Sequence, residues 1–493
     1  MKQGEPCGQD GHGAGRTAVR AFIVVKKRGN SRGAKGRREV ECARYRNMDN
    51  TSAKVFERTK QAEEAPLWQY TRLRRIAEPC VWTDRMLTAL VEGVKGGKWF
   101  SLMDKVCAER TLRRAWERVH RNDGAAGVDR QSTSFFAKDA DKRLDKLRQE
   151  LREGTYKPCA VKRAWIDKAG RREKRPLGIP TVRDRIVQTA LMIVLEPIFE
   201  REFLPVSFGF RRGIGCKDAL REVDGQLKAG NTWVVDVDFK SFFDTIDHNR
   251  LMELIQRRIS DGRVLKLLEA YLQAEILDGM KGWCPEKGTP QGAVISPLLS
   301  NVYLHELDKR MMESEYRIVR YADDFVVLCE TEAEAEEALA EARKFAEDFG
   351  LTIHPEKTRI GNSRNKGDGF DFLSYHFECK RRWVSRKKLP ELRARLRPRL
   401  KRANKDSLED IIAGVNPTLR GWYGYFKHSH PNVFTQVDGW VRGRLRSILR
   451  KRSKRKGKAK GRDHQLWPNS YFTAYGLFTL EQADKQTRQS LGM

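Results

Sequence analysis

The sequence predicts an α+β protein in which short antiparallel strands carry carboxylates and long helical stretches lie before and after them. Three observations lead to this fold class. Residues 316–328 form two apolar runs around an acidic turn, residues 233–238 read as a short buried strand, and the stretches 82–152 and 389–449 place apolar residues at helical intervals. The 493 residues exceed one compact domain, so we expect two or three domains.

The acidic turn belongs to a predicted β-hairpin. Ile318–Val319 and Phe325–Leu328 are its strands, and Ala322, Asp323 and Asp324 form its tip. Adjacent like charges beside buried strands are unfavourable unless a cation neutralises them, and a divalent ion with oxygen ligands would do so. Taken alone, the Asp-Asp pair is equally typical of an acidic turn that faces water.

A third carboxylate upstream favours the metal interpretation. Val234, Val235 and Val237 mark a buried strand, and Asp236 and Asp238 fall on one face of it because side chains alternate along a strand. A strand that ends in Asp beside a hairpin tipped by Asp-Asp can hold two magnesium ions for in-line phosphoryl transfer.

Charge and composition restrict the partners. The net charge of +31 and the isoelectric point near 9.9 indicate a polyanionic partner. An anionic membrane would also attract this charge, but no apolar run approaches the roughly 18 residues that span a bilayer. The N-terminus lacks an apolar signal segment, and the nine cysteines are scattered singly without a zinc-site spacing. We therefore expect a cytoplasmic protein that is associated with nucleic acid and not with a membrane.

Two motifs together resemble a known family. Tyr321–Asp324 with Asp238–Asp244 is similar to the palm of a reverse transcriptase, and the flanking sequence resembles the bacterial group II intron reverse transcriptase/maturase family over roughly residues 82–480. The resemblance implies a right-hand polymerase with an N-terminal helical extension, fingers and palm, and an α-helical thumb or maturase domain. It also implies catalysis with two Mg²⁺ ions held by Asp238, Asp323 and Asp324. Of these we expect Asp324 to be the least direct ligand.

Asp236 is predicted to support the site without binding the metal, although the sequence also allows Asp236 to be a metal ligand in place of another aspartate.

The same resemblance assigns five nucleotide-binding residues, which are Lys168, Arg175, Phe243, Gln291 and Lys357. Residues 161–180 read as strand, basic turn and strand, and a hairpin tipped with Lys and Arg can bind a triphosphate. A solvated basic turn and a surface lysine are the alternatives for the three cations. Phe243 matches the bulky residue that abuts the sugar 2′ position and selects deoxynucleotides; otherwise it would be part of an aromatic core pair.

Gln291 lies in a long Gly- and Pro-rich motif, residues 288–301, which matches the polymerase loop under the templating pair. Ser207–Lys217 resembles the family segment before the palm strand, and we expect Phe208 and Phe210 there to be core residues. Thr331 should cap a helix that ends at Gly350, and the next strand should begin at Leu351. Residues 369–375 resemble the hairpin that grips the primer end.

The C-terminal third is basic and helical. Residues 442–462 contain 12 Lys or Arg and no acid, a pattern that is often a solvated tail but here leads into an ordered-looking segment. We expect this region to lie along a nucleic-acid backbone with strong salt dependence. The predicted RNA-binding residues are Arg397, Arg399, Lys401, Arg420, Lys451 and Arg452.

The predicted domain boundaries follow these shifts in composition. Residues 1–47 are basic and are expected to be disordered or a spurious extension ahead of Met48. The remaining predicted units are the N-terminal helical extension 48–152, the fingers and palm 153–378, the thumb or maturase domain 379–455, and the basic segment 456–493. Longer family members add a zinc-dependent H-N-H endonuclease, and no Cys/His spacing of that kind occurs here.

The function implied by the resemblance is RNA-directed DNA polymerisation combined with binding of a group II intron RNA to promote its splicing and mobility. The expected partners are this intron RNA, an RNA template with a DNA primer, deoxynucleoside triphosphates and target DNA; the sequence leaves homodimer formation open. Two alternatives remain: a splicing factor that binds RNA without polymerising, and a reverse transcriptase used in phage defence or CRISPR adaptation. An RNA chaperone needs no metal triad, which favours the polymerase.

Overall fold

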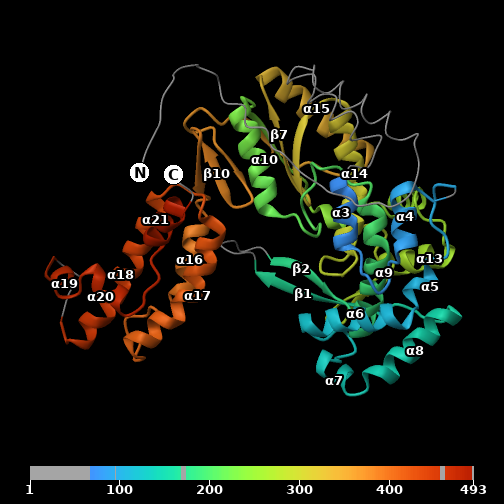
Figure 1. Ribbon diagram of the computed structural model, residues 1–493, viewed down its shortest axis with the longest axis horizontal. Helices are drawn as coiled ribbons and strands as arrows, with labels where there is room; N and C mark the ends of the chain where they lie inside the picture. The colour runs from blue at the N-terminus through green and yellow to red at the C-terminus, as the bar shows by residue number, and fades with distance from the viewer. Residues whose placement is uncertain (1–66, 95, 168–173, 456–460, 491–493) are drawn as a thin grey trace, which may run out of the picture. The chain divides into compact units, whose positions relative to one another are not determined.

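The computed structural model describes residues 67–94, 96–167, 174–455 and 461–490 (Figure 1). These residues form helices and three β-sheets, which confirms the predicted α+β class. The predictions for residues 1–47 and for Lys168 lie outside the described part of the chain.

The N-terminal part is helical, as its apolar spacing predicted. Leu112 and Trp116 are buried on one face of an amphipathic helix. A loop at residues 124–129 follows this helix, and its Ala125 carbonyl accepts a hydrogen bond of 2.8 Å from Arg185 Nη2. The helices are α3 (Leu67–Ile76), α4 (Asp84–Glu92), α5 (Met103–Val106), α6 (Glu109–Asn122), α7 (Thr133–Ala137) and α8 (Ala140–Glu153).

A four-stranded sheet in the order β2-β1-β4-β5 follows. Strands β1 and β2 pair antiparallel from Lys162↔Ile179 to Asp167↔Lys174, which confirms the two predicted strands; the predicted basic turn, residues 168–173, lies outside the described residues. The strands are β1 (Val161–Asp167), β2 (Lys174–Ile179), β4 (Ile276–Asp278) and β5 (Lys281–Trp283). Helix α9 (Val182–Glu200) starts directly after this hairpin with Thr181 as its N-cap and is buried along most of its length.

The central sheet has the order β6-β7-β3-β8, with every neighbouring pair antiparallel. Its strands are β3 (Trp233–Asp238), β6 (Arg317–Tyr321), β7 (Asp324–Cys329) and β8 (Arg359–Asn362). The predicted strand at residues 233–238 and the predicted hairpin around Ala322 are therefore confirmed. Between β3 and β6 the chain forms α11 (Phe242–Thr245), α12 (His248–Gln256), α13 (Gly262–Leu272) and α14 (Ser296–Glu313).

The two faces of the central sheet are buried against different elements. Val235 and Val237 belong to the main core with α14 and with α15 (Glu332–Asp348), whereas Val234 packs with α10 (Cys216–Ala229) and with a small three-stranded sheet. Because side chains alternate along β3, Asp236 and Asp238 share the face of Val234. The carboxylates thus lie on the side of the central sheet that faces α10 and the small sheet.

The segment after α15 agrees with the prediction in part. Thr331 caps α15 as expected, and Ile353 forms a single antiparallel bridge with Phe239 before a turn, but the next full strand is β8 at Arg359–Asn362. Pro355 has no N–H to donate to a ladder, and the N–H groups of Lys357 and Thr358 bond back to the His354 carbonyl in a turn. The turn delays the strand and brings Lys357 close to β3.

The small sheet contains the predicted hairpin at residues 369–375 and has the order β11-β10-β9. Its strands are β9 (Phe370–Phe372), β10 (Tyr375–Glu378) and β11 (Arg381–Val384). The Tyr375 hydroxyl donates to the Tyr425 carbonyl at 2.6 Å and so connects the sheet to the C-terminal helices.

The C-terminal helices have their own core, which includes Val415, Leu419, Phe434 and Leu445. They are α16 (Lys388–Leu396), α17 (Leu408–Phe426), α18 (Asn432–Arg452), α19 (Gly461–Leu466), α20 (Asn469–Ala474) and α21 (Leu480–Ser490). In the residues that the structure describes, no helix combines the length and apolar character needed to cross a bilayer.

Candidate active site

The turn between β6 and β7 places three carboxylates together. Tyr321 pairs with Asp324, so Ala322 and Asp323 form a two-residue turn, and Ala322 adopts a positive φ of 60°. Asp238 is the direct cross-strand partner of Asp324. Opposed residues of an antiparallel pair lie on the same face, with Cβ atoms about 5 Å apart. Two carboxylates therefore face one another across the ladder, with the third in the adjoining turn.

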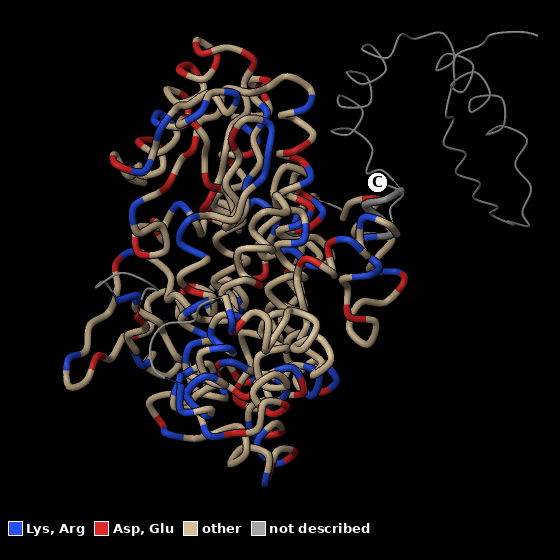
Figure 2. The backbone as a smooth tube through the Cα atoms, turned by 90° about the vertical axis from the view of Figure 1, so that its left-hand side faces the viewer, with Lys and Arg blue, Asp and Glu red and all other residues tan. Residues whose placement is uncertain are grey.

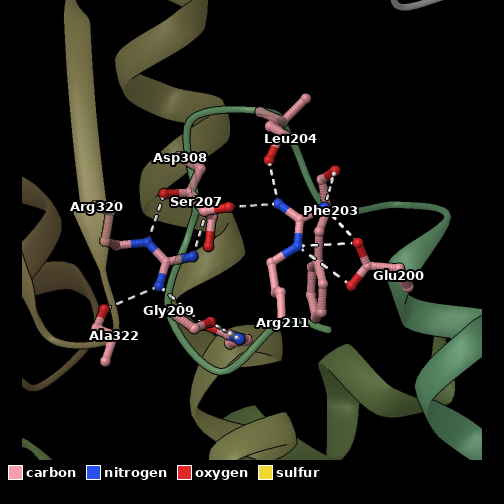
Figure 3. Close-up of polar contacts among 10 residues, drawn as sticks. Glu200, Phe203, Leu204, Ser207, Gly209, Arg211, Asp308, Arg320 and Ala322 are labelled. Carbon is pink, nitrogen blue, oxygen red and sulfur yellow. Dashed lines mark hydrogen bonds and ion pairs between the residues drawn. The ribbon is translucent and has the colours of Figure 1, made fainter. Parts of the chain in front are cut away.

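A buried arginine holds this turn from behind (Figure 3). Arg320 in β6 is fully buried and forms an ion pair of 2.5 Å with Asp308 of α14. Its Nη1 also donates to the Ala322 carbonyl at 2.9 Å and to Asn301 Oδ1 at 3.1 Å. Since both charged groups are paired and hydrogen-bonded, the buried pair fixes the turn without leaving an unsatisfied charge.

The loop between α9 and α10 supports the same turn. Asn301 Nδ2 donates to the Gly209 carbonyl at 2.9 Å, and a Cβ on Gly209 would lie only 2.1 Å from the Ala322 nitrogen. Arg211, paired with Glu200 at 2.6 Å, donates at 2.6 Å to the Ser207 carbonyl and so secures the loop (Figure 3). Only glycine allows the two backbones to approach this closely.

The two Phe residues of this loop that were predicted to be core residues differ in burial. Phe208 is buried as expected, but the expectation for Phe210 is wrong, because its side chain is 47% exposed and its φ is 58°. Phe210 thus adopts the left-handed conformation, which is uncommon for a bulky residue, directly after the glycine that packs against Ala322.

The carboxylates have insufficient neutralising charge. Burial, together with the charges of Asp236, Asp323 and Asp238, raises the pKa of Asp324 to about 8. Burial also raises the pKa of Asp323, and the charge of Asp238 adds to this effect. Lys357 Nζ donates to Asp238 Oδ2, which supplies one nearby cation. A site that raises the pKa of its carboxylates in this way favours an additional cation.

Asp236 has a different neighbour. It is the cross-strand partner of Arg359, whose Nε lies 4.0 Å from Asp236 Oδ2 and whose Nη2 donates to the Gly369 carbonyl. Burial raises the pKa of Asp236 to about 7, although Arg359 opposes the shift. This connection between β3 and the small sheet suits the supporting role that the sequence predicted.

No complete metal cage is formed by these side chains. Within the described residues, no group of three or more His, Cys, Asp or Glu side chains could hold a metal ion. Asp238 accepts from Lys357, and Asp323 and Asp324 occupy adjacent positions of a turn and a strand. The assignment of Asp238, Asp323 and Asp324 as metal ligands therefore stays a prediction. Their donor set, hard carboxylate oxygens with little neutralising charge, fits Mg²⁺.

The loop that contains Gln291 connects β2 with α11, the short helix that follows β3. The Gln291 carbonyl accepts from the Gly178 N–H of β2 at 2.6 Å, while the Thr289 N–H donates to the Phe243 carbonyl at 2.7 Å. Phe242 is buried in the core, whereas Phe243 is only partly buried. Of these two neighbouring aromatic residues, Phe243 is therefore the one that is partly exposed.

Arg175 of β2 influences one of the carboxylates through its charge. Its positive charge lowers the pKa of Asp323, against the larger effect of burial and the effect of Asp238. The assignment of Arg175 to nucleotide binding stays a prediction. Lys168 belongs to the segment that the structure leaves undescribed.

The predicted RNA-binding residues are all exposed on the C-terminal helices and their connections. Figure 2, seen from the side where these helices lie in Figure 1, shows Lys and Arg recurring along this part of the chain. Arg420 lies over the Phe478 ring, 5.5 Å from its centroid, and Arg452 donates to the Asp406 carbonyl. The exposed residues are Arg397, Arg399, Lys401, Arg420, Lys451 and Arg452.

Arg320, Asp308 and Gly209 were not found by sequence reasoning. The available signal was weak, because β6 and α14 each contain more than one charged residue and no pattern marks Arg320 and Asp308 among them. Such residues, when buried, are usually paired with each other.

Two protein families match this chain. Residues 166–377 match the family described as reverse transcriptase (RNA-dependent DNA polymerase). Residues 389–467 match the family described as the maturase-specific domain of group II introns. The two matches follow one another along the chain and together include the central sheet and most of the C-terminal helices.

The chain is also similar to individual proteins. The chain is 38% identical over 208 residues to the group II intron-encoded protein LtrA of Lactococcus lactis subsp. cremoris, covering 42% of this chain and 34% of LtrA. It is 35% identical over 294 residues to protein YkfC of Escherichia coli K12, covering 52% of this chain and 76% of YkfC. A solved Cas6-RT-Cas1–Cas2 complex aligns with a TM-score of 0.33 and 22% identity, over 50% of this chain and 41% of that one. The chain thus spans about a third of the length of LtrA.

Proposed function

Because the chain belongs to the group II intron reverse transcriptases that carry a maturase domain, we propose that it is an RNA-directed DNA polymerase that also binds its intron RNA to promote splicing and mobility. One observation carries the polymerase assignment: Asp238 and Asp324 oppose each other across the β3–β7 ladder, with Asp323 in the adjoining turn. The substrates are deoxynucleoside triphosphates and an RNA template with a DNA primer. The further partners are the intron RNA and target DNA.

The carboxylates have the chemistry that nucleotidyl transfer requires. Asp238, Asp323 and Asp324 would hold two Mg²⁺ ions, which lower the pKa of the primer 3′-hydroxyl and stabilise the leaving oxygen when bound. Arg320 and Gly209 keep the turn in one conformation, so its carboxylates need no reorganisation when substrate arrives. Lys357 donates a hydrogen bond to Asp238 and is available to contact a phosphate.

The surrounding residues orient the nucleotide. Arg175 offers a planar fork to the triphosphate, with Lys168 as its predicted companion. The partly exposed ring of Phe243 excludes a ribose 2′-hydroxyl and so selects deoxynucleotides. The Gln291 loop is hydrogen-bonded to both Gly178 and Phe243, and it supports the templating base pair from below.

The RNA-binding function is assigned to the C-terminal helices. Their exposed cations, among them Arg397, Arg420 and Lys451, provide phosphate contacts without base readout. The alternative of an RNA-binding splicing factor without polymerase activity requires only this surface and leaves the buried carboxylates unexplained.

Extension of a DNA primer on an RNA template with deoxynucleotides and Mg²⁺ tests the proposal. We expect extension by the purified protein, its loss with a chelator, and its return when Mg²⁺ is restored. A well-folded preparation that binds the template–primer but adds no nucleotide in Mg²⁺ would overturn the polymerase assignment.

A further inference from the structure

A basic cavity lies at the opposite end of β3 from the catalytic carboxylates. It has a volume of about 270 Å³ and is enclosed by the end of α10, by residues 363–364 after β8, and by the hairpin β10–β11. Thr232, which also lines it, directly precedes β3, whose last residue is Asp238. At about 3.3 Å per strand residue, the cavity is roughly 20 Å from the active site.

The cations around this cavity exceed the acids. Lys228 and Arg382 share Asp224, at 2.7 Å and 3.7 Å. The other three cations, Arg364, Lys380 and Arg381, are exposed and have no ion pair within the described part of the chain. A site with three unpaired cations attracts an anion with several negative groups.

The hairpin tip that carries two of these cations is held in an unfavourable conformation. Glu378 pairs with Arg381, so Cys379 and Lys380 form a two-residue turn with φ values of 49° and 60°. Turns of this kind favour Asn-Gly, and non-glycine residues in such a region are energetically unfavourable. The Cys379 N–H donates to the Ser363 carbonyl at 2.8 Å and holds the tip against Arg364. The structure thus maintains the cations at the cavity edge.

The interior of the cavity suits part of a nucleotide better than a bare ion. Leu227 and Phe377 line it with apolar atoms, and Asp224 and Glu378 offer carboxylate oxygens that accept from ribose hydroxyls or base amino groups. Unpaired RNA loops expose unstacked nucleotides that can enter a cavity, whereas the bases of a DNA duplex remain stacked.

We propose that this cavity binds an unpaired loop of folded RNA, with Arg364, Lys380 and Arg381 on its phosphates, while a template–primer occupies the active site. The inference rests on the proposed function, because the bound RNA is distinct from the RNA that is copied. It gives the protein a second RNA contact, on the palm and separate from the C-terminal helices.

The test compares two charge reversals of equal size. The double variant Lys380→Glu/Arg381→Glu changes the cavity edge, and Arg343→Glu/Lys344→Glu changes two exposed cations of α15. The probe is a labelled RNA hairpin with an unpaired loop, with a DNA hairpin of the same sequence beside it. We expect the cavity variant alone to lose roughly tenfold or more in affinity for the RNA hairpin, with a smaller salt dependence.

Two further measurements distinguish a failure of this inference from a failure of the proposed function. Saturating template–primer should leave the RNA hairpin bound to the wild-type protein, and the cavity variant should extend a primer at the wild-type rate. Equal losses in both charge reversals, displacement by template–primer, or equal binding of the DNA hairpin would each overturn the RNA site. Failure of the wild-type protein to extend a primer would instead overturn the proposed polymerase.

Discussion

Two hairpin tips of this protein share an unfavourable backbone conformation but differ in their surroundings. Ala322 at the β6–β7 tip is buried, and Gly209, Arg320 and Asn301 contact it or its neighbours. Lys380 at the β10–β11 tip is exposed, and its cation has no ion pair in the described residues. The first tip is therefore held in place by packing so that its carboxylates can act in catalysis, whereas the second tip exposes a positively charged side chain. Substitutions at the first should change activity through structure, and those at the second only through binding.

The largest expected effect is at the catalytic carboxylates. Asp238→Asn removes a charge opposite Asp324 and should reduce primer extension at least about 10³-fold, since roughly 4 kcal/mol of transition-state stabilisation is lost. Steady-state extension rates on an RNA template measure this loss. Asp145→Asn, on the exposed face of α8, is the matched control and should retain wild-type activity. Comparable activity of Asp238→Asn and the control would exclude Asp238 from the site.

The support beneath Ala322 should be the next most sensitive feature. Gly209→Ala places a methyl group 2.1 Å from the Ala322 nitrogen, so the turn must move, at a stability cost of about 1–3 kcal/mol. We expect extension to fall roughly 10²-fold, because a displacement of about 1 Å has this effect on catalysis. Gly225→Ala in α10 meets no atom within 4 Å and serves as the control. Thermal melts with rate measurements on both variants decide whether the contact is required.

The buried pair Arg320–Asp308 should show strong coupling. Removing one partner leaves an uncompensated buried charge, so Arg320→Met or Asp308→Leu alone should destabilise the fold by about 3–5 kcal/mol. The double variant should recover much of this stability, because both charges are then absent. Its extension rate should stay low, since the hydrogen bond from Arg320 to the Ala322 carbonyl is still missing. A double-mutant cycle from denaturant unfolding measures the coupling, and additive losses would contradict it.

The smallest of these effects concerns substrate choice. Phe243→Ala removes the ring proposed to exclude a 2′-hydroxyl and should reduce the preference for deoxynucleotides by about 1–3 kcal/mol, roughly 10- to 200-fold. The ratio of kcat/KM for a deoxynucleotide and its ribonucleotide measures the change. Phe242→Leu, in the buried core beside it, should lower stability and leave the ratio unaltered. An unchanged ratio in Phe243→Ala would show that Phe243 serves only as a core residue.

Much of the site could be predicted from sequence because its signals are local. Asp238 and Asp323 stand at the ends of apolar runs whose alternation fixes the strands, and the register then follows from the hairpin. The support could not be predicted, because Arg320 meets Asp308, and Gly209 meets Ala322, only through tertiary packing. The strand expected at Leu351 is reduced to the bridge at Ile353 for a local reason, since Pro355 and the turn at His354 interrupt the ladder.

The most direct test of the central claim measures primer extension and intron splicing in the same preparations of wild type and Asp323→Ala. The account predicts that the variant loses extension on an RNA template but still promotes splicing, because the exposed cations of the C-terminal helices are unchanged. A wild-type protein that promotes splicing yet adds no deoxynucleotide would contradict the account and show that the carboxylates serve no polymerase.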